Sequence, residues 1–330
     1  MPIRERVTVG VMATTTAPPL QTDAHATAHR RQFQRFAWAV LGWNILVVLW
    51  GAYVRASGSG AGCGNHWPFC NGEVVPRAPQ LTTIIEFTHR MMSAVALILV
   101  VALYLFAVWR FQKGHVVRRV AAWGIVFMLT EALLGAGLVL FRYVDHNESV
   151  GRALYLSAHL VNTQLLLAVL AMTAFFSAVR TPQLTGAWSP RLLATLPVAV
   201  GVSVTGVIAA LGDTLYPAAS FAAGVRQEMS ATAGILLRLR IVHPAIAILG
   251  ALYIAGMAIL WIREDRKLAF AAALLTVAQL GAGALNVALL APVWMQIVHL
   301  LVADLLWITL VLLCLRSTAR PFLPGAPSGT

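Results

Sequence analysis

Charged residues and cysteines are both scarce in this sequence. Only 11 % of its 330 residues are Asp, Glu, Lys or Arg, whereas a soluble globular domain carries about 25 %. This shortage excludes a water-soluble domain, a disordered segment and a nucleic-acid-binding module. The net charge of +12 is therefore assigned to Lys and Arg in loops between apolar segments. Three cysteines are too few for a disulfide scaffold.

Long apolar runs dominate the remainder, since 59 % of the residues are hydrophobic. At about 20 residues per crossing, the chain has room for roughly eight membrane spans. β-barrel strands would be short and alternating in polarity, whereas these runs are continuous, so the predicted class is an all-α membrane protein. Breaks at charges, Gly or Pro place the spans at 36–54, 84–109, 120–141, 153–179, 191–211, 240–262, 268–290 and 293–315.

The distribution of Lys and Arg predicts the orientation in the membrane. Sixteen of them fall in the N-terminal tail, the even-numbered loops and the C-terminus, and seven in the odd-numbered loops. Positive residues concentrate on the cytoplasmic side, so both termini are expected there, as loose tails over 1–35 and 317–330. No secretory signal is visible, and the Ala-rich composition favours a multi-pass protein of a prokaryotic plasma membrane.

A four-helix unit is repeated along the chain. Leu134-Gly135-Ala136-Gly137 recurs as Leu280-Gly281-Ala282-Gly283. Gly51 precedes His89 by 38 residues, and Gly206 precedes His243 by 37. Because four helices separate the copies, the repeats are parallel, related by an axis along the membrane normal. The expected fold is eight transmembrane helices in two pseudo-symmetric four-helix bundles, at 36–180 and 181–316.

Four histidines share one depth in the expected bundle: His89, His159, His243 and His299 each lie within about two turns of the outer end of an even-numbered helix. A single intramembrane histidine can be a helix–helix hydrogen-bonding residue, but four at matching repeat positions favour a function. Two imidazoles on opposite sides of a four-helix core suit the two axial positions of a haem iron. A proton relay is the alternative. The other histidines are expected at solvated surfaces: His25, His29, His66, His115 and His146.

A carboxylate breaks the symmetry of the repeat. Glu86 lies three residues before His89, on the same helix face, whereas Arg240 holds the corresponding place before His243. A guanidinium there can bind a haem propionate; a carboxylate can instead exchange protons with a substrate. The simpler alternative is that Glu86 pairs with Arg90 or only begins its helix.

Two further carboxylates fall within the expected spans. Glu131 is in the middle of the third span, and Asp304 follows His299 by five residues. For each we weigh a structural hydrogen bond against a direct catalytic role.

The first outer loop carries Cys63 and Cys70. The predicted orientation places this loop in an oxidising compartment, where a disulfide persists. Such a disulfide acts either as a structural clip or in redox chemistry, since the loop leads directly into Glu86 and His89. Cys314 is expected to be an inert core thiol.

Taken together, these motifs resemble the haem A synthase family. The resemblance covers roughly residues 36–315. It is carried by Gly51-x-x-Val54-Arg55-Ala56-Ser57-Gly58-Ser59-Gly60, by the Cys63…Trp67-Pro68-x-Cys70 loop, by Glu86-Phe87-Thr88-His89-Arg90, and by the other three placed histidines. It implies an oxidoreductase that converts a methyl group of haem O to the formyl group of haem A, for the biogenesis of terminal oxidases.

The resemblance also implies roles for individual residues. His243 and His299 would hold a haem b cofactor in the second half, and His89 and His159 the substrate haem O in the first. Glu86 matches the catalytic carboxylate, and Cys63 and Cys70 the outer cysteine pair. The implied partners are haem O, the lipid bilayer, haem O synthase and cytochrome oxidase assembly factors. Many relatives carry a second cysteine pair, but residues 212–239 contain no Cys, which argues against a mechanism requiring two disulfides.

Three other functions compete with this interpretation. A non-catalytic di-haem membrane cytochrome explains the four histidines but neither Glu86 nor the cysteine loop. A haem-handling transporter or chaperone would leave haem chemically unaltered. A proton-coupled transporter would use the histidines without any haem.

Overall fold

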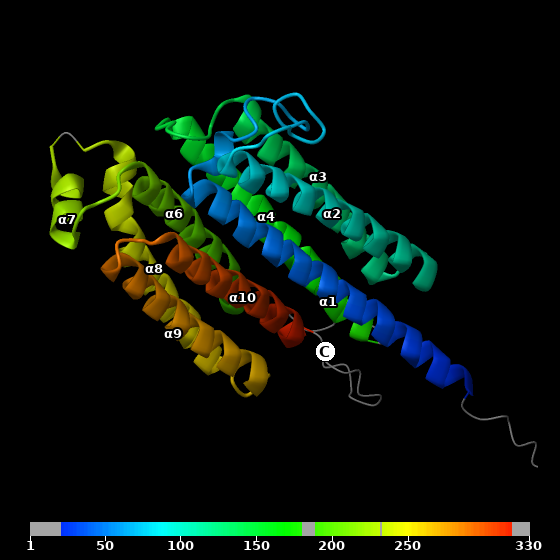
Figure 1. Ribbon diagram of the computed structural model, residues 1–330. Coiled ribbons are helices and arrows are strands. Elements are labelled where there is room, and N and C mark those ends of the chain that lie inside the picture. Colours follow the sequence, from blue (N-terminus) through cyan, green and yellow to red (C-terminus); the bar gives the residue numbers. More distant parts are fainter. Residues whose placement is uncertain (1–20, 180–188, 232, 319–330) are drawn as a thin grey trace, which may run out of the picture.

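A computed structural model describes residues 21–179, 189–231 and 233–318 of the chain, and within these ranges the regular structure is entirely helical. Figure 1 shows the arrangement. The helices are α1 (Gln21–Ala56), η1 (Ser59–Ala61), α2 (Leu81–Arg110), α3 (Val116–Leu140), α4 (Val150–Ala178), α5 (Pro190–Leu193), α6 (Thr195–Leu215), α7 (Phe221–Met229), α8 (Ile235–Leu260), α9 (Arg266–Ala288) and α10 (Val293–Thr318).

Eight helices of the described chain are long and apolar enough to cross a membrane. They correspond one to one to the spans expected from the sequence, and their ends differ by a few residues except at the start of α1. The short helix α5 and α6 together form one of them, Pro190–Leu215. The all-α class and the multi-pass membrane character are thereby confirmed, while the side of the membrane that holds the termini stays a prediction.

Helix α1 begins well before the span expected at residue 36. Residues 21–35 were expected in a loose tail, but they are helical. Phe33 is fully buried, and its ring centroid lies 5.1 Å from that of Phe106 and 5.0 Å from that of Phe111. No continuous apolar run marks this segment, because single residues attach it to the bundle: Phe33 through its ring contacts, and Arg30 through a hydrogen bond to the carbonyl of Val179 at 3.1 Å. The rest of the expected tails, 1–20 and 319–330, lies outside the described residues.

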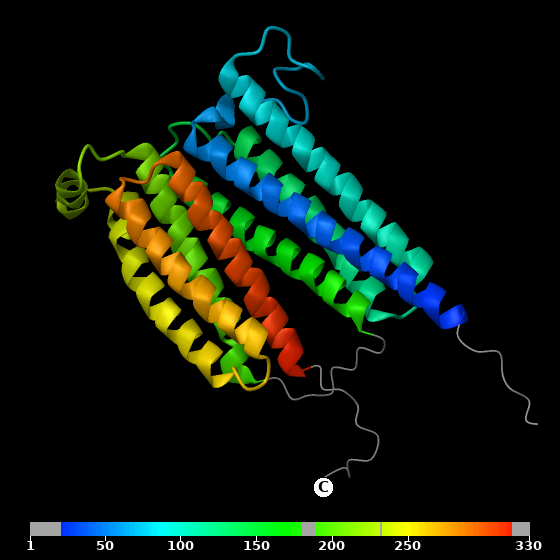
Figure 2. The same ribbon diagram turned by 60° about the horizontal axis from the view of Figure 1, so that its bottom comes forward.

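The helices form two groups that pack side by side (Figures 1 and 2). We call α1–α4 the first half and α6, α8, α9 and α10 the second half. The main apolar core belongs to the first half, but Trp307 and Val311 of α10 join it. Trp307 also donates a hydrogen bond from Nε1 to the carbonyl of Gln164 on α4, at 2.7 Å. The expected boundary at residue 180 lies outside the described residues, and the pseudo-symmetry of the halves stays a prediction.

Arg55 joins the two halves at the end of the bundle that carries the Cys63–Cys70 segment. Its guanidinium donates to the carbonyl of Ala210 at 2.9 Å and to Oγ1 of Thr214 at 2.8 Å, both on α6. It also donates to Oε1 of Gln296 on α10 at 2.9 Å. A long, partly buried cation thus ties the two halves together near the predicted haem sites.

Candidate functional site

Each of the four histidines faces a glycine on the preceding long helix. A methyl group added at Gly51 would lie 3.0 Å from Cε1 of His89. The corresponding distances are 3.1 Å from Gly206 to His243 and from Gly283 to His299, and 3.9 Å from Gly135 to His159. Small residues at these contacts let each imidazole lie close against its neighbouring helix.

These contacts correct the register of the repeat. The sequence alignment places Gly137 opposite Gly283, but in the structure Gly135 and Gly283 are the residues that face the imidazoles, while Gly137 packs against Tyr155. The two Leu-Gly-Ala-Gly motifs are therefore offset by two residues with respect to the histidines.

The histidines come together in the pairs expected from the sequence. His89 on α2 and His159 on α4 are close enough to interact electrostatically, as are His243 on α8 and His299 on α10. The Nδ1 atoms of His89 and His299 are buried without a hydrogen-bond partner among the described residues. A buried imidazole nitrogen without a partner is costly and is a good metal ligand, so the residues present fit two haems. The axial-ligand roles stay predictions.

The partners of the rings differ between the halves. Nδ1 of His243 lies 3.0 Å from the hydroxyl of Thr205. Nδ1 of His159 instead lies 3.5 Å from carboxylate oxygen Oε1 of Glu131. The Gln279 amide donates to Nε2 of His299 at 3.3 Å. Sequence reasoning named Glu131 but did not place it against His159.

Glu86 is buried, with 3 % of its surface exposed. Its Oε1 accepts hydrogen bonds from Nε and Nη2 of Arg90, at 3.2 and 2.6 Å. Its Oε2 accepts from the backbone N–H of Cys63 at 2.8 Å. The ion pair with Arg90, raised from the sequence as the simpler alternative, is thus present, and the carboxylate also holds the cysteine loop. The catalytic role of Glu86 stays a prediction.

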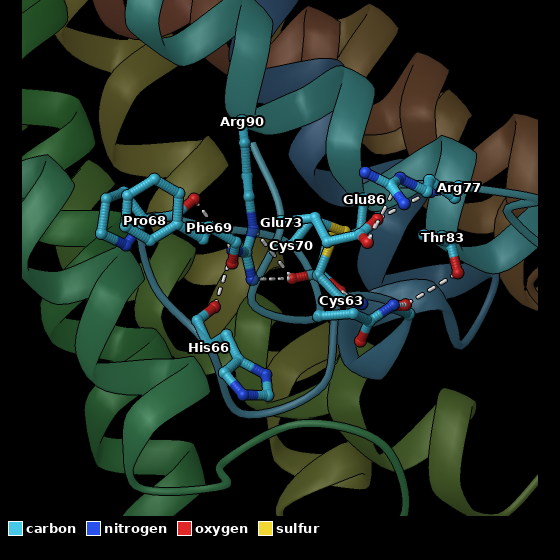
Figure 3. The surroundings of a disulfide bond; sticks show 12 residues. Cys63, His66, Pro68, Phe69, Cys70, Glu73, Arg77, Thr83, Glu86 and Arg90 are labelled. Atoms are coloured by element: carbon cyan, nitrogen blue, oxygen red, sulfur yellow. Dashed lines mark hydrogen bonds and ion pairs between the residues drawn. A yellow bond between two sulfur atoms is a disulfide. The ribbon is translucent and has the colours of Figure 1, made fainter. Parts of the chain in front are cut away.

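The disulfide between Cys63 and Cys70 is confirmed, and both residues are buried. Figure 3 shows Arg90 reaching from α2 to the loop, where Nη1 donates to the carbonyls of His66 and Phe69, both at 2.7 Å. The hydroxyl of Thr83 donates to the carbonyl of Gly62 at 2.8 Å. Gly62 must be glycine, because any Cβ would overlap the backbone of Thr82. The loop is therefore fixed to α2 by its main chain as well as by the disulfide.

Arg240 is engaged by two carboxylates that the sequence did not place near it. It forms ion pairs with Glu228 on α7 and with Asp213 on α6, the latter at 3.3 Å. Neither partner is within a helical turn of Arg240 in sequence, and α7 was not expected, so no local signal pointed to them. A propionate at Arg240 would share the guanidinium with these groups.

The two remaining polar candidates lie on α10. Asp304 is 4 % exposed, and its Oδ2 has no hydrogen-bond partner among the described residues. Cys314 is a buried free thiol, and its Sγ lies 3.7 Å from the carbonyl of Leu192.

An apolar groove runs between α3 and α4. Its walls include Thr130, Leu134, Ala158, Val161 and Asn162. The groove is lined by the same two helices that carry Glu131 and His159.

Fold and site together define a multi-pass helical membrane protein with one imidazole pair in each half and a disulfide loop beside one of them. The chain matches the COX15-CtaA family, described as cytochrome oxidase assembly proteins, over residues 34–311, and it belongs to that family.

Individual relatives carry two different names. A Thermus thermophilus protein called protoheme IX farnesyltransferase is 46 % identical over 293 residues, which are 86 % of this chain and 48 % of that protein. The chain therefore spans about half the length of this relative. An Exiguobacterium sibiricum heme A synthase is 36 % identical over 101 residues, 31 % of this chain and 34 % of the relative. A Bacillus licheniformis heme A synthase is 43 % identical over 100 residues, 29 % and 32 % of the two chains.

Proposed function

We propose that this protein is a haem A synthase, which oxidises the methyl group of haem O to the formyl group of haem A. The observations that carry the proposal are the neighbouring imidazoles of His89 and His159 and, about one turn from His89 on α2, the buried carboxylate of Glu86, which Arg90 and the Cys63 amide hold. Membership of a cytochrome oxidase assembly family and relatives named heme A synthase support it.

In this proposal the two halves bind different haems. His89 and His159 hold the substrate haem O, and His243 and His299 hold haem b. The haem b, when bound, supplies one-electron transfer. Arg240 binds a propionate in the second half, in exchange with Asp213 or Glu228.

The groove between α3 and α4 accepts the isoprenoid tail of the substrate. Its apolar walls suit a farnesyl chain, and its place on α3 and α4 suits the tail of a macrocycle bound at His159 of α4. Haem O arriving through the bilayer would then enter from the side, without crossing water.

Glu86 accepts protons at its carboxylate oxygens as the methyl carbon is oxidised in steps to the aldehyde, a change that takes one oxygen atom from water and releases four protons and four electrons. The carboxylate also stabilises positive charge that develops there. Arg90 holds Oε1, and the Cys63 amide holds Oε2. These contacts fix the position of the carboxylate before the substrate binds. Electrons leave through the second half or to an external acceptor.

The proposed partners follow from the substrate. Haem O synthase supplies the substrate, assembly factors of cytochrome oxidase receive the product, and the bilayer carries both.

A second candidate function comes from the Thermus relative, whose name describes transfer of a farnesyl group to protohaem. The two activities have different products. Farnesyl transfer converts protohaem to a farnesylated haem, whereas oxidation converts an already farnesylated haem to a formyl haem.

Expression in two bacterial hosts tests the proposal. One host makes haem O, the other makes protohaem only, and extracted haems are separated by chromatography. We expect haem A in the first host and unchanged protohaem in the second. Haem O appearing in the second host would favour farnesyl transfer. Unchanged haems in both, with haem bound to the purified protein, would favour an electron-transfer cytochrome or a haem carrier.

A further inference from the structure

Among the four histidines, His159 is the one whose ring faces a carboxylate at ion-pair distance in the described residues. Oε1 of Glu131 lies 3.5 Å from its Nδ1, and that nitrogen is buried with no other partner. The distance is long for a hydrogen bond, as is common before a ligand fixes the ring.

The Glu131 carboxylate is held in place by α4, the helix that carries His159. Asn162 donates from Nδ2 to Oε2 at 2.5 Å, and the hydroxyl of Thr163 donates to Oε1. Thr130 in turn donates to Oδ1 of Asn162 at 2.6 Å. Asn162 and Thr163 lie within about one turn of His159, so the carboxylate and the imidazole are fixed to each other.

The second half carries an amide at the matching position. Glu131 precedes by four residues the glycine that faces His159, and Gln279 precedes by four the glycine that faces His299. Their contacts differ, because Gln279 donates to Nε2 of His299, whereas Glu131 faces Nδ1 of His159. A carboxylate can only accept from Nδ1–H, which leaves Nε2 free for a metal.

We propose that Glu131 is a positioning residue for His159. It accepts the Nδ1 proton, directs Nε2 toward the iron of the substrate haem, and strengthens the imidazole as a donor, as carboxylate partners of metal-bound histidines do. The proposal rests on the proposed function only in taking His159 as a haem ligand. It makes the first-half site more electron-rich than the second, in which the partners are an amide and a hydroxyl.

The substitution Glu131→Gln places the amide of the second half into the first. It keeps one acceptor oxygen, which Asn162 can use, and its NH2 group can donate to the hydroxyl of Thr163. Purified protein loaded with haem O and haem b is compared with the wild type by ferric electron paramagnetic resonance, redox titration and haem retention. We expect the spectrum and potential of one haem to change, with the potential rising, and retention of that haem to weaken by about 10- to 100-fold. Glu131→Asp should restore part of both properties. The matched control Gln279→Ala should leave the first-half signal unchanged.

Unchanged spectra and potentials in Glu131→Gln, with only a lower unfolding temperature, would show that Glu131 merely ties α3 to α4 and would overturn the proposal. A first-half signal that shifts as expected in a protein that makes no haem A would instead overturn the oxidase function and leave the positioning role standing. Failure of the wild type to bind any haem would overturn both.

Discussion

The two halves share the same packing of histidines against glycines and differ in the polar residues around those histidines. In both, a glycine on one helix packs against a histidine on the next, and the two histidines of the half interact. The first half adds two carboxylates, Glu86 and Glu131, and a disulfide loop. The second half has Arg240 and Gln279 near its histidines. A few polar positions thus separate a site suited to proton exchange from a site suited to holding a cofactor.

The largest expected effect follows from Glu86→Gln, which removes from the first half alone the carboxylate that we propose to exchange protons. We expect haem O to accumulate and haem A formation to fall by about 100- to 10,000-fold, the range for loss of a general acid or base. Chromatography of extracted haems measures this. Gln keeps an oxygen for the Cys63 amide, so the loop should stay in place.

The matched control for this variant is its counterpart Arg240→Gln in the second half, which should weaken haem b retention without removing the proton-exchanging group. Thiol labelling reports whether the disulfide still forms. Abundant haem A in the Glu86→Gln variant would show that the oxidation does not need this carboxylate, and the proposed functional difference between the halves would fall. Loss of both haem A and the disulfide would assign Glu86 to holding the loop.

The glycines that face the imidazoles allow each half to be disabled separately. Gly51→Leu should displace His89 and abolish haem binding in the first half, and Gly206→Leu should do the same to His243 in the second. The overpacking should cost about 1–3 kcal/mol of folding stability. The haem-to-protein ratio and the spectrum of the remaining haem provide the measurement.

Gly42→Leu and Gly256→Leu are the controls for these substitutions, since a Cβ at either position meets nothing within 4 Å. Both should keep two haems. If Gly51→Leu removed both haems at once, the sites would not be independent, and the division into halves would need revision.

Much of this arrangement could be predicted from the sequence, because it depends on residues close together in the chain. Apolar runs marked the spans, and the predicted orientation of the loop that carries Cys63 and Cys70 suggested their disulfide. The missed features join residues far apart. Phe33 of the extension of α1 packs against Phe106 of α2. Arg240 pairs with Asp213 near the end of α6 and with Glu228 on α7, a helix that gave no apolar signal.

The side-chain partners of the histidines could not be predicted from the sequence for the same reason. Helical spacing put Glu131 inside a span, but only the rotation of α3 against α4 decides that it faces His159 rather than lipid. The repeated Leu-Gly-Ala-Gly motifs suggested a register that the packing shifts by two residues. Such rotations depend on side-chain packing along the whole helix, and the pattern of apolar residues constrains them only loosely.

The disulfide is present in the first half, and its removal should have a smaller effect than the substitutions above. A bridge that closes so short a loop should contribute about 2–3 kcal/mol to folding stability. Arg90 and Thr83 hold the loop main chain independently. The double variant Cys63→Ser, Cys70→Ser should therefore unfold at a lower temperature yet still produce haem A.

Thermal unfolding and haem extraction, each with and without reductant, check this expectation. Reductant should lower the unfolding temperature of the wild type and leave that of the double variant unchanged. Complete loss of haem A in a folded double variant would show that the cysteines act in redox chemistry, which would give the first half a third functional group.

The smallest expected effect concerns the groove between α3 and α4. Ala158 is exposed in the groove wall, so Ala158→Trp should fill the space proposed for the isoprenoid tail. Because the ring would displace only the tail, the apparent KM for haem O should rise several-fold while the spectrum of haem b stays unchanged. Ala94→Trp, on an exposed position of α2 away from the groove, is the matched control and should have no effect. Equal KM values in the two variants would place the tail elsewhere, and the difference between the halves would then lie in their polar groups alone.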